Sequence, residues 1–183
     1  MIVGIHHTAL STRDADRLLR FYRELFGFEV EFDFPWDESN AAFEQSHAVG
    51  KTAGRVVMIS NGSSRLEIFE YRKPAPRPDI GGRANADLGI AHFGIEVRDI
   101  EKEYARLSAA GMKFQSPLVT QTPTIKMAYG RDPDGNIIEL IDFDASEARS
   151  EPTRGFASGE ANGTAGGVTP RGAPASERPE EFP

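Results

Sequence analysis

The sequence predicts an α+β protein that is built from two copies of one unit. Two observations lead to this prediction. Residues 4–14 align with residues 89–99, so that Gly, Ile, His, Arg and Asp recur at the same relative places. Residues 65–71 and 137–143 are also similar, and they would close the two copies with apolar strands. Self-similarity of this kind indicates a duplicated supersecondary unit, here a strand, a helix and a hairpin.

The first strand of each copy leads into a helix with recognisable ends. In the first copy the helix begins after Asp14, a residue type favoured at the N-cap, and ends at Gly27, which suits a left-handed C-terminal position. Apolar residues beginning at Leu18 follow the i, i+3, i+4, i+7 spacing of a helix that buries one face. In the second copy Asp99 and Gly111 stand at the equivalent ends.

A hairpin follows each helix. The first turns at Asn61-Gly62 and the second at residues 132–135, Asp-Pro-Asp-Gly, where glycine accepts a positive φ. Residues 56–59 and 125–129 are the expected partner strands, and each copy has room for one further strand after its helix. We therefore expect module one at residues 1–72, a linker at 73–87 and module two at 88–143, together one domain of residues 1–143.

Beyond residue 143 the composition changes. Residues 144–183 are rich in Gly and Pro and contain no Ile, Leu, Met, Trp or Tyr. Such a segment cannot bury enough apolar surface to offset its ordering entropy. We expect a disordered tail, with folding on a partner as the alternative.

The overall composition excludes several functions. The 183 residues include no cysteine, which excludes disulfides, thiolate metal sites and cysteine nucleophiles. With 21 Lys+Arg against 28 Asp+Glu, the formal net charge of −7 argues against nucleic-acid partners and anionic membranes. No apolar run is long enough to span a membrane, and no signal peptide is visible. We expect a cytoplasmic protein whose metals, if any, are held by His, Asp, Glu or neutral donors.

The two modules differ most within residues 33–51, where the first copy is longer. Phe34 and Trp36 lie there together with Glu44. An inserted loop with large aromatic side chains is often a lid or a binding element. A hydrophobic flap that seals the domain or meets a partner subunit is an equal alternative.

The repeat places one histidine and one glutamate at matching positions in each module. They are His7 and Glu67 in the first copy and His92 and Glu139 in the second. Each of these residues, taken alone, is typical of an ordinary surface or core position. Their duplication favours a shared role. Two imidazoles and two carboxylates suit a divalent first-row ion, and we expect the four to meet in one cleft. With six-coordination, two positions would remain for adjacent oxygens of a substrate.

These residues make the chain resemble the vicinal oxygen chelate superfamily, the glyoxalase/bleomycin-resistance/dioxygenase fold. The resemblance covers residues 2–143 and is carried by residues 5–7, 14–27, 66–69, 91–93 and 132–140. It implies two βαβββ modules that form an open, mixed-sheet barrel around a metal site. It also implies, as in many members, a homodimer.

Within the superfamily the His-Glu-His-Glu set is most similar to bacterial glyoxalase I. That resemblance implies a lyase or isomerase that binds one divalent ion (Ni, Co, Mn, Zn or Fe). The enzyme would chelate adjacent oxygens of a small substrate and stabilise an enediolate after proton abstraction by Glu67 or Glu139, with Glu44 a weaker candidate base. An Fe(II) extradiol-type dioxygenase, which needs only His7, His92 and Glu139, is the alternative. A metal-free small-molecule binding or resistance protein is a third possibility.

Four residues are candidates for substrate contact. Phe34 and Trp36 would supply aromatic surface from the insertion, and Lys126 and Arg131 would attract an anionic substrate from the second hairpin. Ordinary surface charge is the alternative for both cations. His47 has no counterpart in module two, and we expect it to be a surface residue.

Overall fold

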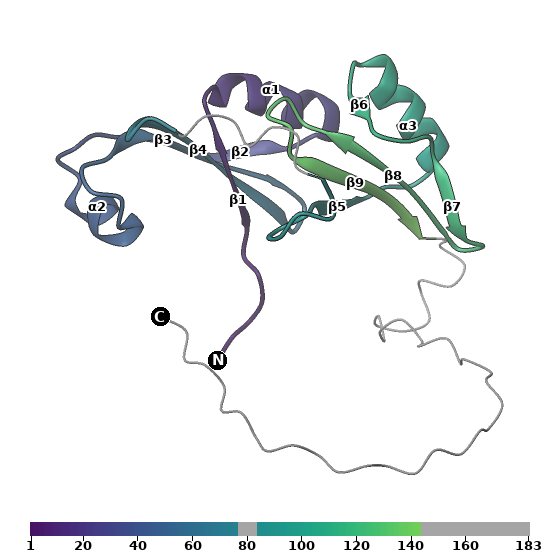
Figure 1. Ribbon diagram of the computed structural model, residues 1–183, viewed down its shortest axis with the longest axis horizontal. Coiled ribbons are helices and arrows are strands. Elements are labelled where there is room, and N and C mark those ends of the chain that lie inside the picture. The colour runs from purple at the N-terminus through teal and green to yellow at the C-terminus, as the bar shows by residue number, and fades with distance from the viewer. Residues whose placement is uncertain (77–83, 144–183) are drawn as a thin grey trace, which may run out of the picture. The chain divides into compact units, whose positions relative to one another are not determined.

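The two units repeated in the sequence form two separate mixed β-sheets, each with a helix on one side (Figure 1). The computed structural model describes residues 1–76 and 84–143. The predicted tail and part of the predicted linker lie outside the described residues. Among the described residues, none of the helices is long and apolar enough to span a membrane.

Module one has the order strand, helix, strand, short helix, strand, strand. Its elements are β1 (Thr8–Thr12), α1 (Ala15–Phe26), β2 (Glu29–Trp36), α2 (Ala41–His47), β3 (Ala53–Asn61) and β4 (Ser64–Lys73). The sheet order is β1-β4-β3-β2, with β1 parallel to β4 and the other pairs antiparallel. The extra strand that the sequence left room for is therefore β2, and the insertion contains α2.

Module two repeats this arrangement, except that its second strand is divided into β6 and β7. Its elements are β5 (Phe93–Glu96), α3 (Ile100–Ala109), β6 (Lys113–Phe114), β7 (Val119–Thr122), β8 (Ile125–Arg131) and β9 (Ile137–Phe143). The order is β5-β9-β8-β6, with β7 also paired to β8, and β5 is parallel to β9. The predicted α+β fold of two βαβββ modules is confirmed, with two open sheets rather than a closed barrel.

The helix boundaries follow the sequence prediction, with one correction. Asp14 caps α1, because its side chain accepts a hydrogen bond from the backbone N–H of Arg17. Asp99 precedes α3 with a positive φ of 55°, but its side chain makes no capping hydrogen bond. The first N–H of α3, that of Ile100, donates instead to Asp142 of β9 over 3.2 Å. The sequence could not show this contact, since the acceptor comes from a strand far along the chain.

One main hydrophobic core joins the two modules. It contains residues of α1 and α3 together with the helix-facing residues of both sheets, such as Ile68 of β4 and Leu140 of β9. A polar contact crosses the same boundary, since the buried phenol of Tyr22 donates to Asp132 over 2.9 Å. Asp132 also accepts the backbone N–H of Asn136 and so orders the predicted second turn. The other face of module one's sheet carries Glu67, and that of module two's sheet carries Glu139.

Candidate metal site

The first predicted histidine–glutamate pair is formed in module one. His7 immediately precedes β1, and Glu67 lies in β4, which runs parallel to β1 with Ala9 opposite Glu67. This pairing brings Nε2 of His7 to 3.1 Å from Oε2 of Glu67. Side-chain exposure is 34% for the histidine and 17% for the glutamate, so the pair is accessible although half-buried.

The second pair repeats this geometry in module two. His92 immediately precedes β5, and its Nε2 lies 3.4 Å from Oε2 of Glu139 in β9. Gly94 is opposite Glu139 in the parallel ladder, where an added Cβ would make only an ordinary contact, 3.4 Å from Oε2. Nδ1 of His92 is buried without a hydrogen-bond partner among the described residues.

The two pairs differ in the residue that faces the glutamate from the neighbouring strand. Tyr129 of β8 is opposite Glu139, and its hydroxyl donates to Oε1 over 2.9 Å. Met58 of β3 occupies the equivalent place opposite Glu67. Burial and the bond to Glu139 raise the pKa of Tyr129 to about 12, so at neutral pH the phenol is a protonated donor. Sequence analysis did not select Tyr129, whose only signal is its register opposite Glu139.

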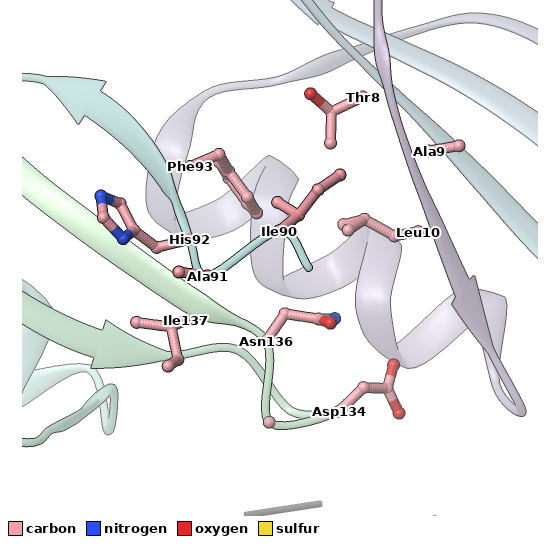
Figure 2. Close-up of a pocket in the computed structure, with 11 residues that line it drawn as sticks. Thr8, Ala9, Leu10, Ile90, Ala91, His92, Phe93, Asp134, Asn136 and Ile137 are labelled. Atoms are coloured by element: carbon pink, nitrogen blue, oxygen red, sulfur yellow. The ribbon is translucent and has the colours of Figure 1, made fainter. Parts of the chain in front are cut away.

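Within one chain the two pairs remain separate. Across residues 1–76 and 84–143, no group of three or more His, Asp or Glu side chains is placed to hold one metal ion. Each histidine lines its own cavity: His7 one of about 420 Å³ and His92 one of about 200 Å³. Figure 2 shows His92 at one end of the smaller cavity and Thr8 and Leu10 of β1 at the other. The four-ligand site therefore stays a prediction. Each module contributes two of the four predicted ligands.

The residues predicted in the insertion lie on α2 and the strand before it. Trp36 is 4% exposed and donates from Nε1 to the hydroxyl of Thr52 over 3.3 Å, so it is part of a small core. Phe34 is 46% exposed and is free to contact a ligand. Glu44 lies on α2, where its carboxylate pairs with Lys51 at 3.1 Å.

The two predicted cations have partners elsewhere. Lys126 pairs with Glu101 of α3, which places its ammonium group on the helix side of the sheet. Arg131 donates to the carbonyl of Gly135 over 2.6 Å and to Gln115 over 3.0 Å, and so braces the second hairpin. Their roles in attracting a substrate remain predictions.

The donor set fits a divalent cation. Each half-buried carboxylate is paired with an imidazole, which is charged only when protonated. A neutral imidazole brings no positive charge to Glu67 or to Glu139, whose one further donor among the described residues is the hydroxyl of Tyr129 at Glu139. A cation shared by the nitrogen and the oxygen would supply that positive charge, and these are donors that first-row divalent metals accept. His7, Glu67, His92 and Glu139 are the residues that would hold it.

The fold and these paired side chains define a duplicated α+β protein with two equivalent imidazole–carboxylate half-sites. A family model described as the glyoxalase/bleomycin resistance protein/dioxygenase superfamily matches residues 4–140. The chain belongs to this superfamily, which confirms the resemblance found in the sequence.

Relatives of known name include enzymes. A 2-epi-5-epi-valiolone epimerase from Actinomyces sp. is 28% identical over 158 residues, which are 82% of this chain and 85% of that protein. A lactoylglutathione lyase from Schizosaccharomyces pombe is 26% identical over 156 residues, 81% of this chain. The chain spans only 49% of that lyase. A glyoxalase family protein from Bacillus cereus has the same fold, with a TM-score of 0.71 at 20% identity, covering 78% of this chain and 95% of that one.

Proposed function

We propose that this protein is a metal-dependent isomerase or lyase that moves a proton next to a carbonyl group of a small substrate with adjacent oxygens. The observation that carries the proposal is the duplicated pairing of His7 with Glu67 and of His92 with Glu139. The epimerase and lyase among its relatives support the reaction class.

We further propose that each complete site is built by two chains of a homodimer. Module one of one chain would supply His7 and Glu67, and module two of its partner would supply the other pair. The separation of the pairs within one chain supports this arrangement.

The asymmetry between the glutamates suggests their roles. Glu139 accepts a hydrogen bond from Tyr129, which fixes its orientation and suits a permanent ligand. Glu67 faces Met58, a side chain that donates no hydrogen bond, and is therefore better suited to move and to take the proton. The bound cation would supply Lewis acidity that stabilises negative charge on the substrate oxygens. A positioned carboxylate base contributes rate factors on the order of 10² to 10⁴.

Return of the proton decides the product. If Glu67 returns it to the same carbon from which it came, the product can be an epimer. If Glu67 returns it to the neighbouring carbon, and the hydroxyl proton passes to the former carbonyl oxygen, the carbonyl and hydroxyl groups exchange places. Both outcomes need the same residues, so the site supports the reaction class rather than one substrate.

A mixed-dimer experiment tests the site. One chain carries His7→Ala with Glu67→Gln, the other carries His92→Ala with Glu139→Gln, and two affinity tags isolate the mixed dimer. A site shared between chains gives one intact site per mixed dimer, and therefore one tightly bound Ni²⁺ by calorimetry, against none in either parent. A mixed dimer that binds no metal while the wild type does would refute the shared site.

A second measurement tests the reaction class. Metal-loaded protein is incubated in D₂O with 2-hydroxy ketones and with the hemithioacetal of methylglyoxal and glutathione. Solvent deuterium should enter the carbon next to the carbonyl in at least one substrate. Turnover without deuterium would count against proton abstraction, and oxygen consumption with catechol by the Fe(II) form would favour the dioxygenase.

A further inference from the structure

The second ring nitrogen of His7 meets the residue just before it in the chain. Nδ1 of His7 lies 3.0 Å from Nδ1 of His6, and the two rings meet edge to face at a centroid distance of 5.3 Å. At this distance one ring nitrogen donates a hydrogen bond and the other accepts it. Because β1 begins only at Thr8, the alternation of strand side chains does not separate the two residues. Both nitrogens of His7 are therefore engaged, Nε2 with Glu67 and Nδ1 with His6.

Module two has no equivalent of this contact. The repeat aligns His6 with Ala91, whose methyl group neither donates nor accepts a hydrogen bond. Nδ1 of His92 is buried without a hydrogen-bond partner among the described residues. The two half-sites thus differ in which predicted ligand is supported. His6 contacts the imidazole in module one, and Tyr129 contacts the carboxylate in module two.

His6 lies beside the first half-site without being placed as another ligand. Like His7 it lines the cavity of about 420 Å³, and it is an exposed residue. Within the part of the chain that the structure describes, His6, His7 and Glu67 do not form a group that could hold one ion. His6 can therefore influence a bound metal only through His7.

The positions of the protons on the two rings depend on what Nε2 of His7 binds. An ionised carboxylate only accepts, so next to Glu67 the neutral ring of His7 carries its proton on Nε2 and accepts at Nδ1 from His6. When Nε2 is a metal ligand, the proton of the neutral ring lies on Nδ1 instead. Nδ1–H of His7 then donates, and His6 accepts with its own proton on Nε2. A neutral imidazole satisfies the contact in either state, because its Nδ1 can be a donor or an acceptor.

We infer that His6 is a positioning residue for the predicted metal ligand His7. Its Nδ1 fixes the orientation of the ligand ring and accepts a hydrogen bond from Nδ1–H of that ring. The inference rests on the proposed function, in which His7 holds a divalent ion. Metal-bound histidines in proteins almost always donate their second ring N–H to a neighbour, and loss of that neighbour lowers metal affinity.

The proposed reaction gives this support a purpose in module one. Glu67 is the carboxylate proposed to take the proton, and it has to move to do so. His7 is then the remaining predicted ligand of module one, and His6 keeps its ring in place. In the other half-site Tyr129 holds Glu139. Each half-site therefore keeps one ligand that a hydrogen bond fixes while the base moves.

Substitutions at His6 test this role by calorimetry with Ni²⁺ on the full-length protein. His6→Phe keeps a ring and removes both nitrogens. His6→Asn restores an acceptor, since its amide oxygen is as many bonds from the backbone as Nδ1. His47→Phe is the control for loss of an imidazole. The ring of His47 stacks on Phe43 at 5.0 Å and is half-buried, not at the open surface expected from the sequence.

Nuclear magnetic resonance reads the tautomers at about pH 8, above the pKa of a free imidazole. The chain has four histidines, so the ¹⁵N signals of each ring can be assigned by single substitutions. Loading with Zn²⁺, which is diamagnetic, should move the proton of His6 from Nδ1 to Nε2 and that of His7 from Nε2 to Nδ1. A histidine that only packs beside His7 would keep its tautomer.

His6→Phe should lower Ni²⁺ affinity about 10- to 100-fold, the usual effect of losing such a neighbour. His6→Asn should recover most of the loss, and His47→Phe should bind as the wild type does. Three results would overturn the inference: full affinity in His6→Phe, an affinity of His6→Asn as low as that of His6→Phe, or an unchanged tautomer of His6 in the Zn²⁺ form. A wild type that takes up neither ion refutes the proposed function itself, whereas those three results refute only the role of His6.

Discussion

The hydroxyl of Tyr129 donates to Oε1 of Glu139 over 2.9 Å and makes the second half-site different from the first. The equivalent residue opposite Glu67 is Met58, which has no group to donate. Of the two predicted carboxylate ligands, Glu139 therefore has a hydrogen-bond donor on the neighbouring strand and Glu67 has none there, which is the difference on which their proposed roles rest.

Replacement of Tyr129 by Phe should weaken metal binding. The phenol fixes the orientation of Glu139, and loss of a hydrogen bond to a ligand typically costs about 10- to 100-fold in metal affinity. Calorimetric titration with Ni²⁺ measures the effect. Tyr104→Phe is the matched control, because its hydroxyl donates to the carbonyl of Ser116 on the helix side of module two. Equal affinities of both variants would show that Tyr129 does not support the site.

Glu67→Gln and His92→Ala should each abolish or severely weaken metal binding. The glutamine keeps only a neutral carbonyl donor and loses the negative charge, whereas the alanine loses the imidazole donor, so each variant weakens or removes one of the four predicted ligands. Metal content after dialysis, together with calorimetry, checks this. Glu101→Gln is a useful control, because this carboxylate pairs with Lys126 on the helix side of module two. Full affinity in either site variant would refute the ligand assignment.

The two histidine–glutamate pairs were predictable because each is encoded twice, at matching positions and on matching strand faces. Parallel pairing of β1 with β4 and of β5 with β9 then converts that pattern into contacts of 3.1 and 3.4 Å. The same local reasoning found the turns and the ends of α1.

Contacts that depend on a single copy could not be predicted. His47 lies on a seven-residue helix without a counterpart in module two, and its burial depends on stacking with Phe43. The pairing of Tyr22 with Asp132 joins distant segments that share no pattern. The support of α3 by Asp142 is repeated in module one, where the N–H of Ala15 donates to Glu70 over 2.8 Å, but the repeat alone did not show that these carboxylates reach the helix ends. The separation of the two histidine–glutamate pairs within one chain was not predicted either. The repeat describes each module but not how the two modules are arranged.

Gly54→Ala should destabilise the insertion. The new Cβ would lie 2.4 Å from the carbonyl oxygen of Glu70 and 2.5 Å from the indole of Trp36, so backbone or ring must move. Overpacking of this kind costs typically about 1–3 kcal/mol. Urea unfolding followed by Trp36 fluorescence measures this loss of stability. We also expect the emission maximum of the native variant to be shifted. Gly94→Ala is the control, since its nearest contact would be 3.4 Å.

Tyr22→Phe should lower the free energy of unfolding by about 2 kcal/mol at pH 7, the usual worth of a buried hydrogen bond to a charged group. The phenol is fully buried and donates to Asp132 in the other module. Tyr104→Phe, which removes a bond to a neutral carbonyl, should cost less. Chemical unfolding monitored by circular dichroism compares the three proteins.

The advantage of the wild type over Tyr22→Phe should shrink at alkaline pH. Burial, together with the charge of Asp132, raises the pKa of Tyr22 well above its ordinary value of about 10. Below about pH 10 the phenol is neutral in both states, and its contribution to stability is complete. Above that, the unfolded chain ionises first, so the contribution falls by about 1.4 kcal/mol per pH unit until the folded protein also ionises. A difference between the two proteins that stays constant from pH 8 to about pH 11 would show that Tyr22 titrates normally in the folded protein.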